Sequence, residues 1–167
     1  MIAIATSTRA DWGLLTPLIA EFRKQEMPYT ILASNMHLLP EMGMTIDEIR
    51  ATGEAPVEIP TAGATISDTL ASTTRLHGEW FAANRPQAVV ILGDRYEMLG
   101  VASAATINSI PIIHIAGGTV SEGAMDTAIR KLGDGVAYGI VHRSFRDRPA
   151  CYVDDGDTVN GGCRCYA

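Results

Sequence analysis

The sequence predicts an α/β fold, a Rossmann-like three-layer domain with a mainly parallel sheet. Short apolar runs alternate along the chain with longer stretches in which apolar residues recur at helical spacing. The run Ala88–Leu92 is apolar at every position, which is typical of a parallel strand covered on both faces. Repeated alternation of strand and helix indicates parallel strands joined by right-handed crossovers.

The first half of the chain contains three predicted strands and two predicted helices. The strands are expected over residues 2–5, 29–33 and 57–59. A helix with Pro17 in its first turn is predicted by apolar residues at helical spacing, which are Leu14, Leu15, Leu18, Ile19 and Phe22. The run Thr45–Glu48 has the pattern of a capping box and predicts a short helix through Arg50.

The second half continues the alternation. A long helix is expected over residues 67–84, with Leu70, Trp80 and Phe81 facing inward. After the strand at 88–92, a helix rich in Ala, Leu and Met is expected over 96–108, followed by a strand over 111–115 and a helix over 123–132.

The pattern changes after about Leu132, where Gly, Asp and Arg become frequent and apolar residues lose their period. All three cysteines, Cys151, Cys163 and Cys165, lie in this stretch and are expected to be free thiols. The sequence therefore predicts one Rossmann-like domain over residues 1–132. Residues 133–167 are expected to be an atypical tail, either frameshifted or disordered.

Charge and composition exclude several classes of function. The formal net charge of −6 and the lack of a basic run argue against binding to nucleic acid or to an anionic membrane. Neither a signal peptide nor a membrane-spanning run is present, so we expect a cytoplasmic protein. The glycine motifs of NAD and ATP sites are missing, and we expect no cofactor and no metal.

Polar and glycine residues gather after four of the predicted strands. In open α/β sheets, ligands bind beyond the carboxyl ends of the strands, so these segments are expected to share one edge of the sheet. The four segments are residues 6–13, 34–37, 93–95 and 114–119.

The first of these segments has two interpretations. Small hydroxyl residues and Arg9 at a helix N-terminus suit a phosphate, because unpaired N–H groups and the helix dipole favour anions. Alternatively, Asp11 caps the helix and Arg9 is a surface charge. Spacing alone does not decide between the two.

The other segments also allow more than one interpretation. Asp94 follows a buried strand and one glycine, and is either a catalytic carboxylate or the cap of the next helix. The pair Gly117 and Gly118 allows a ligand to approach the backbone, or simply makes a turn. His37 lies near the expected cleft, and His114 is expected to be a core residue.

Several ordered motifs together resemble the hydrolysing UDP-N-acetylglucosamine 2-epimerases of sialic and legionaminic acid biosynthesis. The resemblance covers residues 1–130. The matching residues are Thr8–Asp11, Gly13–Leu15, Met36–Leu38, Pro40–Glu41, Gly43, Ser67–Thr69, Leu92–Glu97, His114–Ile115, Gly117–Gly118, Glu122–Asp126 and Ala128–Arg130.

This resemblance implies the N-terminal half of a two-domain enzyme of the GT-B fold. It also implies a reaction in which UDP is eliminated from UDP-N-acetylglucosamine and water adds to the resulting glycal, giving N-acetylmannosamine. Carried over by motif, Asp94 and Asp126 would be the catalytic carboxylates. The substrate-binding residues would be Arg9, Asp11, His37, Arg95, Gly117 and Gly118.

Three departures from the family pattern predict an incomplete and inactive form. Ala116 stands where the family usually has an acidic residue or His, and Thr119 where it has Glu. The stretch Lys131–Gly135 breaks the expected helix, and no second domain follows. Two alternatives remain, a non-catalytic nucleotide-sugar-binding module and one half of a GT-B glycosyltransferase. Uncovered apolar surface would favour a homo-oligomer.

Overall fold

The computed structural model describes residues 1–116 and the backbone of residues 151–152 and 164–165. Within the described residues, a five-stranded sheet has the order β3-β2-β1-β4-β5, and every neighbouring pair is parallel. The strands are β1 (Ile2–Thr6), β2 (Tyr29–Ser34), β3 (Val57–Ile59), β4 (Ala88–Leu92) and β5 (Ile112–Ile115). The predicted α/β fold class is confirmed.

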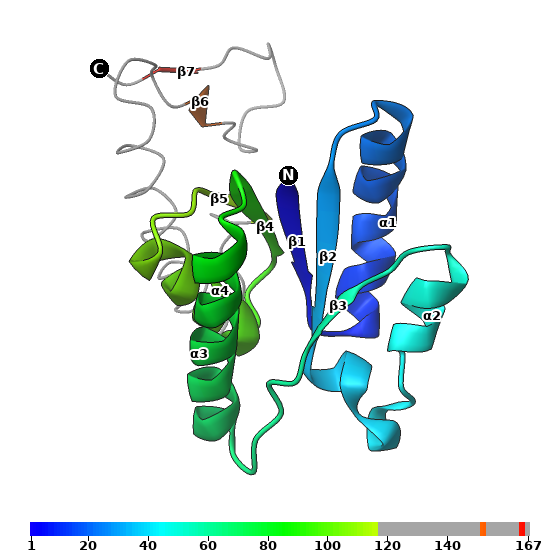
Figure 1. Cartoon of the computed structure of the whole chain (residues 1–167), viewed down its shortest axis with the longest axis vertical. Coiled ribbons are helices and arrows are strands. Elements are labelled where there is room, and N and C mark those ends of the chain that lie inside the picture. Colours follow the sequence, from blue (N-terminus) through cyan, green and yellow to red (C-terminus); the bar gives the residue numbers. More distant parts are fainter. Residues whose placement is uncertain (117–150, 153–163, 166–167) are drawn as a thin grey trace.

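Helices cover both faces of this sheet (Figure 1), which makes three layers. The helices α1 (Arg9–Lys24) and α2 (Ile46–Ala51) lie on one face, and α3 (Ile66–Asn84) and α4 (Tyr96–Ile107) lie on the other. Two short 3-10 helices, η1 (Asn35–Leu38) and η2 (Pro40–Met42), follow β2. The strands β6 (Cys151–Tyr152) and β7 (Arg164–Cys165) form a separate antiparallel pair.

Two hydrophobic cores lie on opposite faces of the sheet because successive side chains of a strand point to opposite sides. In β1, Ala3 and Ala5 pack with α3 and α4, whereas Ile4 packs with α1 and α2. The small residues of α4 let it approach α3 closely. A Cβ added to Gly100 would lie 2.9 Å from Thr73 Cγ2, so a larger residue has no room there.

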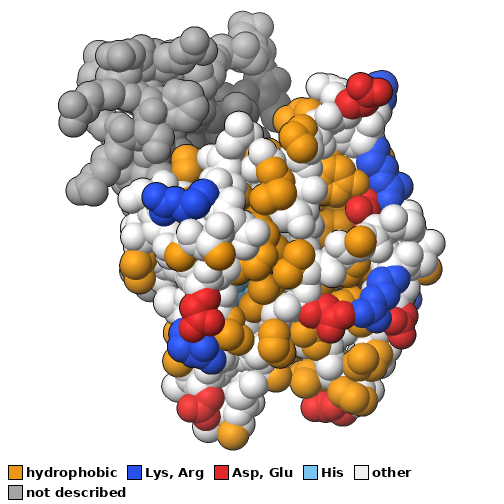
Figure 2. Space-filling view, viewed as in Figure 1, with side chains coloured by type: hydrophobic (Ala, Val, Ile, Leu, Met, Phe, Trp, Pro, Cys, Tyr) orange, Lys and Arg blue, Asp and Glu red, His pale blue; other side chains and the backbone are white. Residues whose placement is uncertain are grey.

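Figure 2 shows one edge of this layered arrangement. Hydrophobic side chains lie along the middle of that face, and charged side chains lie mainly to either side of it. The inward positions predicted for α3 differ in burial: Phe81 is fully buried, while Leu70 and Trp80 are half-buried. His77, to which the sequence assigns no role, is also fully buried between these layers.

The first helix begins earlier than its apolar period indicates. Thr8 caps α1 at Arg9, one and a half turns ahead of Leu14, so Pro17 lies inside the helix and not in its first turn. The apolar period does not reveal this start, because the first turn contains the polar residues Arg9 and Asp11, which do not extend the apolar stripe. The prediction that Pro17 occupies the first turn is wrong.

The capping box predicted for α2 is also wrong, although the helix itself is confirmed. Thr45 has helical backbone angles, φ −66° and ψ −1°, and its side chain makes no capping hydrogen bond. Its hydroxyl is instead bonded to the ring of His37, 2.8 Å from Nδ1. A contact across eight residues has removed the oxygen that the local pattern assigns to the helix N-terminus.

Several predictions fall outside the described residues. They are the helix over 123–132, the sites Gly117, Gly118 and Asp126, and most of the tail over 133–167. Among the helices of the described residues, none is both long enough and apolar enough to span a membrane.

Candidate functional site

A cavity of about 440 Å³ opens beside the carboxyl ends of the central strands. Its wall is built from the start of α1, the η1–η2 turns, the start of α2 and the loop after β4. The lining residues are Thr8, Arg9, Ala10, Met36, Met42, Gly43, Thr45, Glu48 and Arg95. Three of the four segments that the sequence assigns to this edge therefore contribute to one cavity.

The N-terminus of α1 is already partly satisfied by its own side chain. Asp11 Oδ2 accepts hydrogen bonds from the backbone N–H of Ser7 at 3.3 Å, the hydroxyl of Ser7 at 3.0 Å and the N–H of Thr8 at 3.1 Å. The Thr8 hydroxyl in turn accepts from the N–H of Asp11, which completes a capping box. Asp11 therefore shapes the loop behind the cavity wall and does not line the cavity.

Arg9 and Ala10 open α1 and both line the cavity. The first N–H groups of a helix have no acceptor in a preceding turn, so this end of α1 presents donors and a partial positive charge to the cavity. Arg9 itself is paired with Glu48, with 2.9 Å between Nε and Oε2, and its side chain is 74% exposed. Asp11 thus takes part in the helix cap and Arg9 is an exposed charge that lines the cavity, while phosphate binding at this segment stays a prediction.

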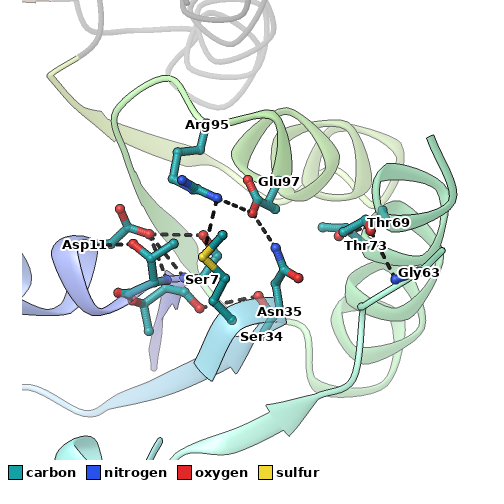
Figure 3. A network of polar contacts seen from close by, with 12 residues as sticks. Ser7, Asp11, Ser34, Asn35, Gly63, Thr69, Thr73, Arg95 and Glu97 are labelled. Carbon is teal, nitrogen blue, oxygen red and sulfur yellow. Dashed lines mark hydrogen bonds and ion pairs between the residues drawn. The ribbon is translucent and has the colours of Figure 1, made fainter. Parts of the chain in front are cut away.

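A second guanidinium reaches the cavity from the loop after β4 (Figure 3). Arg95 Nη2 donates to Glu97 Oε1 at 2.7 Å, and Asn35 Nδ2 donates to the same oxygen at 2.5 Å. Glu97 is fully buried, while the side chain of Arg95 is 33% exposed. The hydrogen bond and the charge of Glu97 raise the pKa of Arg95, although burial opposes them, so Arg95 stays a cation.

His37 lies behind the wall and joins three segments of the chain. Its Nε2 is 3.0 Å from Thr6 Oγ1 and its Nδ1 is 2.8 Å from Thr45 Oγ1. The Thr6 hydroxyl also lies 3.4 Å from the carbonyl of Thr8; with the proton on Nε2 the ring donates to Thr6, and the Thr45 hydroxyl donates to Nδ1. Burial lowers the pKa of His37, which keeps the ring neutral.

Asp94 lies in the turn between β4 and α4, one residue before Arg95, and is half-buried. The N-cap position of α4 belongs to Arg95, so Asp94 is not the helix cap that one interpretation of the sequence expects. Gly93, with φ +74°, gives this turn a backbone that favours glycine.

His114 is not the core residue that its apolar strand suggests. The ring is half-buried, and Nε2 donates to the carbonyl of Gly93 at 2.7 Å. Because β5 neighbours β4 in the sheet, this bond ties the end of β5 to the turn that carries Asp94.

The structure therefore sorts the described candidates into three groups. Asp94 lies in the turn before α4 and is not among the residues that line the cavity. Arg9 and Arg95 line one cavity, whereas Asp11 and His37 support its wall through Thr8 and Thr45. Candidates at Gly117, Gly118 and Asp126 lie outside the described residues.

The sequence interpretation did not single out Asn35, Glu48 or Glu97 as site residues. A signal for Glu97 was available, since it is the one charged residue in an otherwise uncharged helix over 96–107. A lone carboxylate in such a helix is expected to be buried against a partner.

Cations and donors at the cavity suit an anion carried by a larger, partly apolar ligand. Two guanidinium groups and the first N–H groups of α1 favour phosphate oxygens, while Met36 and Met42 provide apolar surface. Among the described residues, no cluster of His, Cys, Asp and Glu side chains could hold a metal ion.

Comparisons with known proteins identify the family of this chain. The family model described as UDP-N-acetylglucosamine 2-epimerase matches residues 20–141, well over half of the chain. The chain is 36% identical over 135 residues to the GDP/UDP-N,N'-diacetylbacillosamine 2-epimerase (hydrolyzing) of Campylobacter jejuni, covering 77% of this chain and 35% of that protein. It is 33% identical to the UDP-N,N'-diacetylbacillosamine 2-epimerase (hydrolyzing) of Legionella pneumophila, covering 77% of this chain and 36% of the other.

Solved structures show the same fold at lower identity. The Methanocaldococcus jannaschii UDP-GlcNAc 2-epimerase in complex with UDP-GlcNAc and UDP superposes with a TM-score of 0.72 at 19% identity, covering 86% of this chain and 43% of that chain. The Neisseria meningitidis UDP-GlcNAc 2-epimerase bound to UDP-GlcNAc gives a TM-score of 0.71 at 14% identity, with the same coverage of 86% and 43%.

The chain spans about a third of the length of the curated relatives that it matches. Its described sheet, five parallel strands covered by helices, agrees with a GT-B-like fold. The match to the family model covers most of that sheet and continues beyond it. The chain belongs to the UDP-N-acetylglucosamine 2-epimerase family.

Proposed function

We propose that the whole protein is a hydrolysing UDP-N-acetylglucosamine 2-epimerase and that residues 1–132 form the N-terminal domain, which holds the sugar diphosphate. The observation that carries this proposal is the cavity at the carboxyl edge, which brings Arg95 and the start of α1 together in a chain of this family. These groups would hold the diphosphate oxygens on which negative charge accumulates when UDP leaves.

The proposed reaction has two steps, an elimination and a hydration. In the first step, a base removes the proton from C2 of the sugar and the bond from C1 to the diphosphate oxygen breaks. UDP departs, and the sugar becomes a glycal. In the second, water gives its hydroxyl to C1 and a proton returns to C2 from the opposite face, which yields N-acetylmannosamine. We assign the proton transfers at the sugar to Asp94 and Asp126.

The remaining site residues are assigned to substrate binding. Arg9 and Arg95 would contact the diphosphate directly, while Asp11 and His37 would act through the wall residues to which they are bonded. Gly117 and Gly118 would let the substrate approach the backbone.

A second substrate is favoured by one observation on the relatives and one on the cavity. The relatives from Campylobacter jejuni and Legionella pneumophila are named for UDP-N,N'-diacetylbacillosamine. Met36 and Met42 give the cavity an apolar wall, which suits a sugar with more acyl and methyl surface than N-acetylglucosamine has. Both UDP-sugars therefore belong in the assay.

We further propose a cytoplasmic homo-oligomer that works in the synthesis of sialic-acid-like sugars. A 32% identical relative from Escherichia coli is named a polysialic acid biosynthesis protein, which supports this setting. Light scattering at micromolar concentration tests the oligomer, and a clean monomer would contradict it.

Binding and turnover are tested separately. Purified chain is titrated with UDP by calorimetry, and is incubated with each UDP-sugar while free UDP and the released amino sugar are measured. We expect UDP to bind and turnover to be absent in this chain, because catalysis in a two-domain enzyme needs closure that excludes water and orients the leaving group. Turnover that is lost in Asp94→Asn would show that the chain is catalytically competent. Absence of UDP binding would contradict the proposed role of the cavity.

A further inference from the structure

We infer that Glu97 is a positioning residue that holds the Arg95 guanidinium in place for the diphosphate of the ligand. The inference rests on the proposed function, since it takes the ligand to be a sugar diphosphate. Glu97 does not line the cavity, and it acts through Arg95, which does.

Burial makes the Glu97 carboxylate dependent on its hydrogen-bond partners. The residue is fully buried, and a carboxylate in that position is costly unless it is paired and hydrogen-bonded. Two donors, Arg95 Nη2 and Asn35 Nδ2, converge on its Oε1. Glu97 Oε2 has no hydrogen-bond partner among the described residues. One oxygen therefore carries both contacts, and the position of that oxygen fixes the position of Nη2.

Asn35 shows that the carboxylate is held from a second strand. The residue directly follows β2 and has φ +47°, a left-handed backbone that Asn tolerates better than most residues. Backbone of this kind tends to occur where surrounding contacts determine it, often at binding sites. Glu97 thus ties the loop after β2 to the loop after β4, across the carboxyl end of β1 that lies between them.

The contact between Arg95 and Glu97 leaves most of the guanidinium available. A guanidinium has five N–H donors. Within the described residues, Nη2 is the nitrogen of the Arg95 guanidinium that contacts Glu97. The same nitrogen makes a long contact of 4.0 Å to the sulfur of Met36. Arg95 Nε is buried and has no hydrogen-bond partner among the residues that the structure describes. The geometry is that of an anchored cation whose Nη donors that are not bonded to Glu97 serve a ligand at the cavity.

Glu97 has two opposed effects on an anionic ligand. Its negative charge weakens the attraction between Arg95 and a diphosphate, whereas its fixed oxygen orders the arginine before the ligand arrives. Two substitutions separate these effects. Glu97→Gln keeps the side-chain length and an acceptor oxygen but removes the charge, and Glu97→Asp keeps the charge but shortens the reach by one methylene.

The experiment measures the affinity of the intact chain for UDP and for inorganic diphosphate by calorimetry. Each variant is made twice, once with Arg95 present and once with the Arg95→Met substitution. We expect Glu97→Asp to weaken both ligands at least fivefold when Arg95 is present and less than twofold when Arg95 is Met. Glu97→Gln should keep affinity within threefold of the parent, or exceed it. Asn35→Gly, which suits the left-handed backbone, should weaken binding in the same Arg95-dependent way.

The outcomes distinguish the two levels of the proposal. If the parent chain binds neither UDP nor diphosphate, the proposed function and this inference both fail. If the parent binds but Glu97→Asp has no effect, or weakens binding equally in both backgrounds, the inference alone is overturned, because Glu97 then acts on the fold as a whole. Thermal melts of every variant identify a loss of folded protein, and if Glu97→Asp does not fold, Asn35→Gly decides by the same criterion.

Discussion

The hydroxyl of Thr16 donates to the carbonyl of Gly13 at 2.8 Å, in the middle of α1. Residue 17 would normally supply an N–H to that carbonyl, but it is proline and has none. The neighbouring side chain thus satisfies the acceptor that Pro17 leaves open, and the helix continues through Lys24.

Replacement of this proline should stabilise the protein. We expect Pro17→Ala to raise the free energy of unfolding by about 1–3 kcal/mol, because alanine restores the backbone hydrogen bond and has a higher helix propensity. Thr16→Val should cost about 0.5–1 kcal/mol in the parent and much less in the Pro17→Ala background. Urea denaturation of the four proteins of this cycle measures both effects, and equal costs in the two backgrounds would contradict the role given to Thr16.

The buried cap of α1 should matter more than the exposed cap of α3. Asp11 and Asp68 occupy equivalent positions in two capping boxes, but Asp11 is buried and accepts three hydrogen bonds, whereas Asp68 is exposed. We expect Asp11→Ala to lower the free energy of unfolding by about 2 kcal/mol and Asp68→Ala by about 1 kcal/mol. Urea denaturation of the two variants at neutral pH compares them, and a larger loss for Asp68→Ala would contradict this account.

His77 should make the protein less stable in mild acid. Burial lowers its pKa from 6.5 to about 4, and among the described residues Nε2 has no partner that would stabilise a proton. Between these values the unfolded chain binds a proton that the folded chain refuses, so stability is full above about pH 6.5 and falls as the pH drops toward 4.

The size of this effect follows from the two pKa values. From about pH 7.5 to about pH 5, His77 should cost about 2 kcal/mol of stability. The measurement is the difference in urea unfolding free energy between these pH values, in the parent and in His77→Leu. The variant should lose about 2 kcal/mol less than the parent over the same range. Equal losses in both proteins would show that other groups cause the acid sensitivity.

Glu48 should weaken binding of an anion at the cavity. It lines the cavity and is paired with Arg9, which also lines it, and both side chains are exposed. We expect Glu48→Gln to raise UDP affinity by about threefold at low salt, since it removes a like charge and releases Arg9, and the gain should fade at about 0.5 M salt. Glu79→Gln, which breaks an exposed pair with Arg75 on α3, is the matched control and should leave UDP affinity unchanged. A gain in the control as large as that in Glu48→Gln would indicate a general charge effect.

The parts of the fold that sequence alone predicts are those set by local periodicity. The run Ala88–Leu92 is read as a buried parallel strand because only burial on both faces suits five consecutive apolar residues, and the structure confirms it. The same reasoning places polar segments at one edge of the sheet, and Arg9 and Arg95 indeed line one cavity. A parallel sheet imposes this convergence whatever the individual side chains do.

The error at Pro17 is local, since the polar first turn conceals the start of α1, whereas the others arise where a contact outside the local pattern overrides it. Thr45 has the sequence of a helix cap, but His37 takes its hydroxyl, and no pattern within four residues reveals that competition. His114 lies in an apolar strand, yet its ring bonds to Gly93 in the turn after the neighbouring strand. The role of Glu97 depends on Asn35, which is 62 residues away along the chain. Each of these facts belongs to the assembled sheet edge and not to any short segment.

The ring of His37 offers a reporter for the cavity that needs no label. With the proton on Nε2, the ring donates to Thr6 in a fully buried position, so that proton should exchange slowly with water and give a resolved downfield proton resonance. The other ring nitrogen, Nδ1, accepts from the hydroxyl of Thr45, and Thr45 lines the cavity. A ligand that moves Thr45 therefore changes the electron density of the His37 ring. A titration followed at this one resonance would therefore report occupancy of the cavity from behind its wall, without any contact between ligand and histidine.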